Sequence, residues 1–223
     1  MSKLAKIIVL DGVDASGKAT QAQMLHENLV RLGYKSRLLS FPNYESESSA
    51  LVKMYLNGAW GNNATSVNPY AAASAYALDR FSTMQNVDLA SYDVLVMDRY
   101  TSSNAIHQAS KLSGEEKSAF LDWIFCYEHE ILKIPRPDKV LFLDMPPEYG
   151  AKLMEGRALK SGTKQDIHEN AHEYLLDSYL NATHIARKFN WQIVSCVKEH
   201  EIQPPEDIQD VILGIALGVL GAK

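Results

Sequence analysis

Cysteine is scarce in this sequence, and its two cysteines have no ligand or disulfide pattern. Cys126 and Cys196 lie far apart in the 223 residues and outside any CxxC or Cys/His spacing. A chain of this length buries enough surface to fold without a disulfide or a structural metal. We therefore expect both thiols to be small buried hydrophobes in a reducing compartment.

Long apolar runs and basic runs are also missing. The longest apolar run, Val211–Leu220, is well short of the roughly 20 residues that a membrane-spanning helix needs. Near the N-terminus, Met1–Lys6 is followed by a run of only four apolar residues, Ile7–Leu10, before Asp11, whereas a signal peptide needs an apolar region of roughly 7–15 residues. The net charge is −5, which disfavours nucleic acids and membrane surfaces as partners. We expect a soluble cytoplasmic protein.

What the sequence does contain is a regular alternation of short apolar runs and longer helical stretches. Hydrophobic residues make up 46% and charged residues 22%, as in globular domains. The apolar runs predict five strands: Lys6–Asp11, Ser36–Ser40, Asp93–Asp98, Lys139–Asp144 and Gln192–Val197. The stretches between and after them predict helices: Ala19–Leu32, Glu47–Leu56, Pro69–Gln85, Ser102–Lys111, Gly114–Leu132, Pro147–Arg157, Glu169–Lys188 and Pro205–Leu220. This order predicts an α/β fold, with one domain over residues 1–223 and helices on both faces of a five-stranded parallel sheet.

A glycine-rich loop follows the first predicted strand and leads into the first predicted helix. It has the form G-x-x-x-x-G-K, in which backbone N–H groups and a helix N-terminus hold a polyphosphate while the lysine reaches the β and γ phosphates. An ordinary glycine-rich turn is the alternative, but the strand and helix on either side favour a phosphate loop. The residues predicted to bind ATP are Gly12, Val13, Asp14, Ala15, Ser16, Gly17, Lys18, Ala19 and Thr20.

The loop departs from its usual form at one position. The Ser or Thr that normally follows the lysine and binds Mg²⁺ is Ala19 here. Either Thr20 and carboxylates hold the metal, or the chain binds nucleotide without turning it over. Asp98, which ends a Walker B-like run, is one such carboxylate, with a helix N-cap or an ion pair with Arg99 as its alternative roles.

Other features narrow the type of phosphate-loop protein. The N-K-x-D motif with which GTPases recognise the base is absent, and a large ATPase needs a longer chain. A basic segment with Lys160 and Lys164 lies within a predicted lid at about residues 157–168. Phosphoryl transfer to a small acceptor requires cations around the phosphates and a lid that excludes water. The sequence therefore favours a small-molecule kinase.

The segment Asp98–Gln108 resembles the D-R-Y-x-x-S-x-x-A-x-Q signature of the thymidylate kinase family. It matches at Asp98, Arg99, Tyr100, Ser103 and Gln108, while Ile106 replaces the alanine. Phe41-Pro42, Asp79-Arg80 and Asp166–Glu169 follow in matching order, so that the resemblance covers roughly residues 6–200. It implies phosphorylation of dTMP to dTDP by ATP, with Mg²⁺, in a homodimer.

The resemblance also implies an acceptor pocket. Tyr76 would stack on thymine, Arg80 would hydrogen-bond the base, and Arg99 would bind the acceptor phosphate, since a planar guanidinium suits a phosphate. Alternatively, Tyr76 is an aromatic residue of the core, and the two arginines form ion pairs at the surface. His107 and His168 stand where relatives carry tyrosines near the sugar, and Tyr44 stands where many carry an arginine. The predicted substrate-binding residues are Phe41, Tyr44, Tyr76, Arg80, Arg99, Ser103, Asn104, His107, Gln108 and His168. Ser102 or Ser103 could instead cap a helix.

The same resemblance implies the catalytic and metal-binding groups. Asp14, Lys18, Arg99 and Arg157 are the predicted catalytic residues, with Arg157 supplying a lid cation because Ala15 stands where some relatives carry an arginine. Asp14, Asp98 and Glu169 are the predicted metal ligands. Two alternatives stay open: a kinase for another nucleoside monophosphate or a deoxynucleoside, suggested by Tyr44 and His107, and a non-catalytic nucleotide-binding protein, suggested by Ala19.

Overall fold

A five-stranded parallel sheet lies at the centre of the computed structural model, which describes residues 4–61, 63, 66–150, 153 and 172–221. The strand order is β2-β3-β1-β4-β5, and every neighbouring pair is parallel. The strands are β1 Lys6–Asp11, β2 Ser36–Ser40, β3 Val94–Asp98, β4 Lys139–Asp144 and β5 Gln192–Ser195. The predicted fold class is confirmed.

The strands are apolar along their length because both faces of the sheet are covered by helices. Alternate residues of β1 point to opposite faces: Ile8 and Leu10 pack in one core cluster, and Ile7 and Val9 pack in another. All four side chains are at most 2% exposed. The carboxyl ends of these strands therefore meet at one edge of a buried sheet, where their terminal carboxylates gather.

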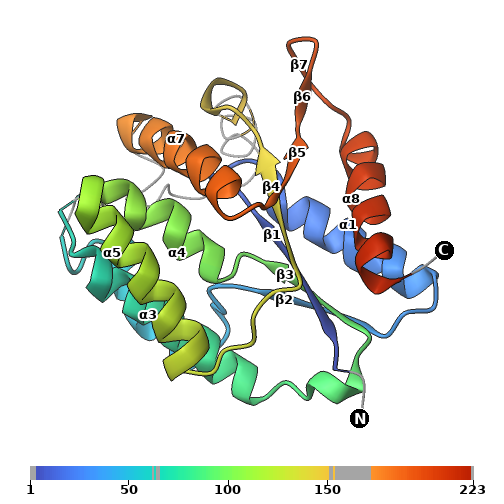
Figure 1. Ribbon diagram of the computed structural model, residues 1–223, viewed down its shortest axis with the longest axis horizontal. Helices are drawn as coiled ribbons and strands as arrows, with labels where there is room; N and C mark the ends of the chain where they lie inside the picture. The colour runs from blue at the N-terminus through green and yellow to red at the C-terminus, as the bar shows by residue number, and fades with distance from the viewer. Residues whose placement is uncertain (1–3, 62, 64–65, 151–152, 154–171, 222–223) are drawn as a thin grey trace.

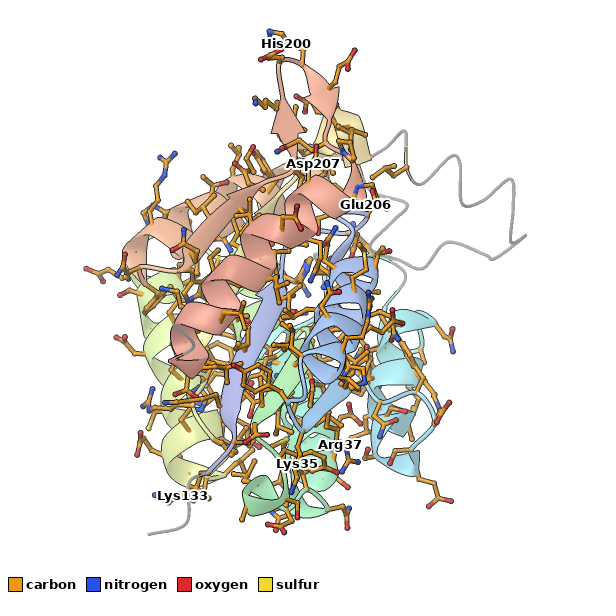
Figure 2. All side chains as sticks on the ribbon, turned by 90° about the vertical axis from the view of Figure 1, so that its right-hand side faces the viewer. Lys35, Arg37, Lys133, His200, Glu206 and Asp207 are labelled. Carbon is orange, nitrogen blue, oxygen red and sulfur yellow. The ribbon has the colours of Figure 1, made fainter. Side chains whose placement is uncertain are left out.

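Helices α1 and α8 cover one face of the sheet, and α3, α4, α5 and α7 cover the other (Figure 1). A short helix, α2, packs against α3. The acidic pair Glu206 and Asp207 lies in the first turn of α8, where the helix dipole favours negative charge (Figure 2). The bounds are α1 Lys18–Arg31, α2 Ala50–Leu56, α3 Pro69–Gln85, α4 Thr101–His107, α5 Gly114–Phe125, α7 His172–Lys188 and α8 Pro205–Leu220.

Several predicted helices are interrupted. The 3₁₀ turn Glu47–Ser49 precedes α2, and the 3₁₀ turn Ala109–Lys111 follows α4. The sequence predicts a single helix over Gly114–Leu132. In the structure, α5 ends at Phe125 and the chain continues as a π-helix over Cys126–Ile131. Single π turns inside helices often occur at functional sites. This one carries Glu128 inward, beneath the site described below.

A hairpin at the end of the sheet was missed by the sequence pattern. The strand predicted over Gln192–Val197 stops at Ser195, and β6 Val197–Lys198 then pairs with β7 Glu201–Ile202. The turn residues Glu199 and His200 both have positive φ without being Asn or Gly, the residues that mark such turns in a sequence. His200 lies at the tip of this projection (Figure 2).

Three smaller predictions have different outcomes. Cys196 is buried as predicted, but the prediction for Cys126 is wrong because this side chain is exposed on the π-helix. Residues 147–150 of the predicted helix Pro147–Arg157 are helical. Residues 157–168, the predicted lid, lie outside the described residues. Within the part of the chain that the structure describes, no helix is long and apolar enough to cross a membrane.

Candidate active site

The glycine-rich loop joins β1 to α1, and its backbone conformations explain its residue types. A Cβ on Gly12 would lie 2.9 Å from the backbone oxygen of Leu143. Gly17, the residue before α1, has φ 85°, a left-handed conformation that glycine adopts without strain. Ala15 also has positive φ, at 60°. The loop therefore wraps tightly before a helix N-terminus, which is a binding site for anions.

Lys18 is buried within this loop. Its Nζ donates to the backbone oxygen of Val13 at 2.6 Å and lies 3.4 Å from the hydroxyl of Ser16. Burial, with a smaller contribution from the charge of Arg99, lowers the pKa of Lys18 to about 8, although Asp14 opposes the shift. A bound polyphosphate would place negative charge next to Lys18 and so favour its charged, ammonium form.

Asp11, at the end of β1, is a buried carboxylate that the sequence analysis did not assign. It accepts hydrogen bonds from the hydroxyl of Ser102 at 2.6 Å, from that of Ser103 at 2.8 Å, and from the backbone N–H of Gly12 at 2.9 Å. The two serines therefore do not cap α4, whose N-cap is Tyr100. The signal in the sequence was a carboxylate immediately before the first loop glycine.

Arg99 joins the glycine-rich loop to the next element of the site. It has φ 67°, a strained conformation for a non-glycine residue, and its backbone N–H donates to Leu10 at 3.0 Å. Its guanidinium forms an ion pair with Asp14 and lies 3.1 Å from Nε2 of His107. An arginine can only donate, so Nε2 accepts. Burial would lower the pKa of Arg99, but Asp14 and other carboxylates raise it.

The alternative roles of Asp98 are not realised. Its carboxylate accepts a hydrogen bond from Ser40 at 3.0 Å, while Arg99 pairs with Asp14 instead. Asp98 is not the N-cap of α4 either. It lies opposite Leu10 in the register of β1 and β3, so it is at the same sheet edge as the glycine-rich loop.

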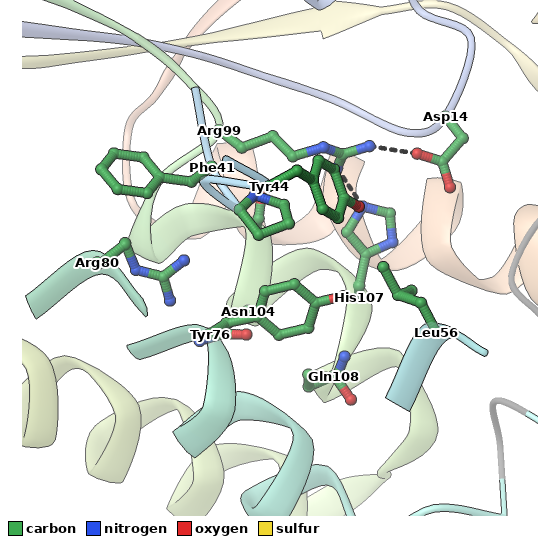
Figure 3. A pocket seen from close by; sticks show the side chains of 12 residues that line it. Asp14, Phe41, Tyr44, Leu56, Tyr76, Arg80, Arg99, Asn104, His107 and Gln108 are labelled. Atoms are coloured by element: carbon green, nitrogen blue, oxygen red, sulfur yellow. Dashed lines mark hydrogen bonds and ion pairs between the residues drawn. The ribbon is translucent and has the colours of Figure 1, made fainter. Parts of the chain in front are cut away.

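A pocket opens beside Arg99, and it brings together every described residue predicted to bind the acceptor. Asp14 of the glycine-rich loop reaches its edge, and the side chains of α3 and α4 face each other across it (Figure 3). Two further lining residues, Pro42 and Leu56, were not predicted. The lining residues are Asp14, Phe41, Pro42, Tyr44, Leu56, Tyr76, Arg80, Arg99, Ser103, Asn104, His107 and Gln108.

Aromatic and amide groups shape this pocket. Tyr76 is half-buried and makes an edge-on contact with Tyr55, the ring centroids being 6.2 Å apart. Tyr44 is 53% exposed and lines the pocket together with Arg99 and His107 (Figure 3). Gln108 is 1% exposed, and within the described part of the chain its Oε1 has no hydrogen-bond partner. Buried polar atoms are usually paired, so this side of the pocket suits a polar ligand.

Asp79 fixes the segment that carries Phe41 and Tyr44. Its carboxylate accepts from the backbone N–H of Asn43 at 2.8 Å and from the hydroxyl of Ser48 at 2.6 Å. Asp79 is fully buried on α3, one residue before Arg80. The segment between β2 and α2 is thereby held against the helix that carries the pocket residues.

Arg80 forms an ion pair, but in the interior rather than at the surface. Its Nε and Nη2 donate to Glu128 at 2.7 and 2.6 Å, and both side chains are at most 1% exposed. Burial lowers the pKa of Arg80, but Glu128 raises it further than burial lowers it. Glu128 was missed by the sequence analysis. Its signal was the position four residues after the buried Ile124, on the core face of the helix.

Two of the three predicted metal ligands, Asp14 and Asp98, lie among the described residues. Among the described residues, no three His, Cys, Asp or Glu side chains form a metal-binding group. Mg²⁺, however, is usually held by one or two carboxylates together with substrate phosphates and water. Asp14 and Asp98 both act electrostatically on Lys18, so both lie near the phosphate loop and fit that donor set. Arg157, His168 and Glu169 lie outside the described residues.

Comparison with known proteins settles the family. The family model for thymidylate kinase matches residues 10–201, a range that includes the glycine-rich loop, the pocket and Glu128. The chain belongs to the thymidylate kinase family. Members of this family are phosphotransferases, and so is this chain.

Matches to individual thymidylate kinases support the same family. The chain is 31% identical over 167 residues to the thymidylate kinase of Mycobacterium tuberculosis, covering 73% of this chain and 77% of that one. It is 26% identical over 214 residues to that of Plasmodium falciparum, covering 92% and 95%. A solved thymidylate kinase structure from Candida albicans superposes with a TM-score of 0.71 at 19% identity, covering 99% of this chain and 94% of that one. This last likeness concerns the fold.

Proposed function

We propose that this chain transfers the γ-phosphoryl group of ATP to dTMP and produces ADP and dTDP. The observation that carries the proposal is the position of Arg99, which contacts the glycine-rich loop through Asp14 and the acceptor pocket through His107. The two substrates would meet at this guanidinium. An acceptor phosphate oxygen would attack the γ-phosphorus in line, without a covalent enzyme intermediate.

On the donor side, the loop and Lys18 hold the polyphosphate. Lys18 leaves its contact with the Val13 carbonyl and neutralises charge on the β and γ phosphates. Asp14 holds Arg99 at the boundary between the two sites in the absence of ligand. The chemistry then consists mostly of positioning and of neutralising charge.

On the acceptor side, the pocket holds the base and the phosphate at opposite ends. Arg99 binds the phosphate, and Tyr76 stacks on the base beside Arg80 and Asn104. His107 lies between these two ends, near the sugar. Phe41, Tyr44, Ser103 and Gln108 complete the enclosure.

Three further parts of the proposal rest on the family resemblance. Bound Mg²⁺ would supply positive charge at the transferring phosphoryl group, and Asp14, Asp98 and Glu169 are the residues that would hold it. A lid at about residues 157–168 would close over ATP, with Arg157 as its cation and His168 near the sugar. Residues 1–223 would act as one kinase domain.

The comparisons give no support to the two alternatives, another acceptor or a binder without turnover. Three departures still distinguish the chain: Ala19 in the glycine-rich loop, and Tyr44 and His107 in the pocket. Tyr44 brings a hydroxyl without charge, so Arg99 bears more of the acceptor phosphate's charge.

A homodimer is part of the same proposal. Leu51 and Met54 of α2 and Leu78 of α3 are 43–46% exposed, and the two helices pack together. Large exposed apolar residues on neighbouring helices suit a second copy of the chain. Light scattering would give about twice the monomer mass if these helices pair. A cytoplasmic location remains a prediction.

The experiment offers the purified chain Mg²⁺, ATP and one acceptor at a time: dTMP, dUMP, UMP, CMP, AMP, GMP or thymidine. ADP release with dTMP well above that with the other acceptors supports the proposal. A preference for another acceptor overturns the assignment of the base pocket. ATP binding without ADP release from any acceptor would indicate a binder, and Ala19→Ser would then test whether a missing metal ligand is the cause.

A further inference from the structure

A buried carboxylate lies behind the base end of the acceptor pocket. Glu128 is fully buried on the π-helix and accepts four hydrogen bonds. Two come from Arg80, one from the hydroxyl of Thr101 at 2.9 Å and one from Nδ2 of Asn104 at 3.0 Å. Two of its three partners, Arg80 and Asn104, line the pocket itself.

These contacts fix which end of the Asn104 amide faces the pocket. Its Nδ2 donates both to Glu128 and to the backbone oxygen of Ala73 at 3.2 Å. Neither of those atoms can donate to an amide oxygen, so the reversed orientation is unfavourable. Oδ1 is the remaining polar atom of the amide, and Asn104 lines the pocket together with Tyr76 (Figure 3).

Arg80 is fixed by the same carboxylate. Nε and Nη2 are both held by Glu128, which leaves Nη1 as the nitrogen outside this ion pair. The pocket therefore presents a guanidinium donor and an amide acceptor from neighbouring helices, α3 and α4. Without Glu128, only the Ala73 carbonyl would hold the Asn104 amide in this orientation, and Arg80 would lose its ion-pair partner.

The order of donor and acceptor distinguishes pyrimidine bases. Thymine offers a carbonyl oxygen at C4 and an N–H at N3, whereas cytosine offers an amino group at C4 and an unprotonated N3. The Arg80 donor and the Asn104 acceptor therefore complement the C4 oxygen and the N3 N–H of thymine. Against cytosine, the donor would face an amino group and the acceptor would face an unprotonated nitrogen. We propose that Glu128 is a positioning residue that sets this polarity, by holding Arg80 and Asn104 in the orientation that selects thymine over cytosine. This inference rests on the proposed function.

The test compares kcat/KM for dTMP and dCMP in the unchanged chain and in Glu128→Gln. The glutamine amide replaces one of the two carboxylate oxygens by an NH2 donor. In either placement this donor faces a nitrogen of Arg80, and in one placement it also faces Nδ2 of Asn104, so the two pocket groups lose their fixed orientation. We expect the dTMP to dCMP ratio to fall by at least about tenfold, because an unpaired polar edge is strongly rejected. A role in folding alone would lower both values equally, and an unchanged ratio overturns the proposal.

A matched control is Thr101→Val, which removes a hydrogen bond to the same carboxylate without changing Arg80 or Asn104. It should lower stability and leave the dTMP to dCMP ratio unchanged. If Thr101→Val lowers the ratio as much as Glu128→Gln does, the assignment to polarity is wrong. Failure of the proposed function looks different, because then the unchanged chain phosphorylates neither acceptor.

A second measurement needs no folded Glu128 variant. In the unliganded chain, both side-chain amide protons of Asn104 are held by Glu128 and Ala73. Their NMR signals, assigned by their loss in Asn104→Ala, should exchange with solvent far more slowly than those of exposed asparagines. Exchange at the rate of exposed asparagines would show that the amide is not fixed, and would overturn the proposal.

Discussion

The guanidinium of Arg99 forms an ion pair with the carboxylate of Asp14, so the residue after β3 is joined to the glycine-rich loop. The same guanidinium contacts His107 on α4. The backbone of Arg99 is in the left-handed conformation, and its N–H donates to the backbone oxygen of Leu10 on β1. An acceptor phosphate that enters the pocket therefore meets a cation already placed beside the donor site.

Replacing Arg99 by alanine should raise KM for dTMP about 10- to 150-fold, because a hydrogen bond to a charged group contributes about 1.5–3 kcal/mol. The affinity for thymidine, which has no phosphate, should change little. Steady-state kinetics and calorimetry would measure the two effects. Arg99→Lys keeps the charge but not the planar fork, so its KM for dTMP should lie between that of the unchanged chain and that of Arg99→Ala. Unchanged dTMP affinity in Arg99→Ala would point to a nucleoside acceptor instead.

Replacing Tyr76 by alanine should weaken dTMP binding by about 1–3 kcal/mol, the contribution of base stacking on an aromatic ring. KM for ATP should stay the same, because Tyr76 lies on α3, away from the glycine-rich loop. The matched control is Tyr76→Phe, which keeps the ring and should retain most of the affinity. Equal losses for ATP and dTMP would mean that Tyr76 supports the fold rather than the base.

The pKa of Lys18, about 8, predicts a proton uptake on ATP binding. Near pH 8 about half of the unliganded chains carry a neutral Lys18, and the polyphosphate favours the charged form. Binding should therefore take up protons near pH 8 and fewer at pH 6.5, where the ammonium is already formed. Calorimetry in buffers of different ionisation enthalpy measures this number. In Lys18→Arg the side chain at this position stays charged throughout this pH range, so ATP binding should take up no proton there. Equal proton uptake in that variant would contradict the assignment of the proton to Lys18.

Replacing Ser102 by alanine should lower the free energy of unfolding by about 1–3 kcal/mol, because the buried Asp11 carboxylate loses a donor. For a chain of this length the melting temperature falls roughly 2–4 °C for each kcal/mol. Ser74→Ala removes a hydroxyl that donates to Tyr70 at an exposed position, and should change stability by less than about 0.5 kcal/mol. Equal melting temperatures for the two variants would show that Asp11 does not need this donor.

The sheet and most helices could be predicted because their signals are local. Continuous apolar runs ending in Asp11, Asp98 and Asp144 mark buried parallel strands, and Asn68 and Pro69 mark the start of α3. The β6–β7 hairpin could not be predicted in this way, since its turn has no Gly, Asn or Asp. Nothing local marks the change from α5 to a π-helix either.

The acceptor pocket could be predicted where a motif places the residue, as for Tyr76, Arg80 and Arg99. Its supporting carboxylates could not, because Asp11 and Glu128 act through contacts between segments far apart in the sequence. Glu128 receives its hydrogen bonds from residues 24 to 48 positions away. A single charged residue at core spacing indicates burial, but not which partners surround it.

The most direct test of phosphoryl transfer to dTMP follows the phosphorus itself. The chain is incubated with Mg²⁺, ATP labelled with ³²P at the γ-phosphorus, and dTMP, and the products are separated. Direct transfer predicts that the label appears in dTDP, with one ADP formed for each dTDP, and that both products disappear when dTMP is omitted. Label released as inorganic phosphate, or retained on the protein, with dTMP left unchanged would contradict it.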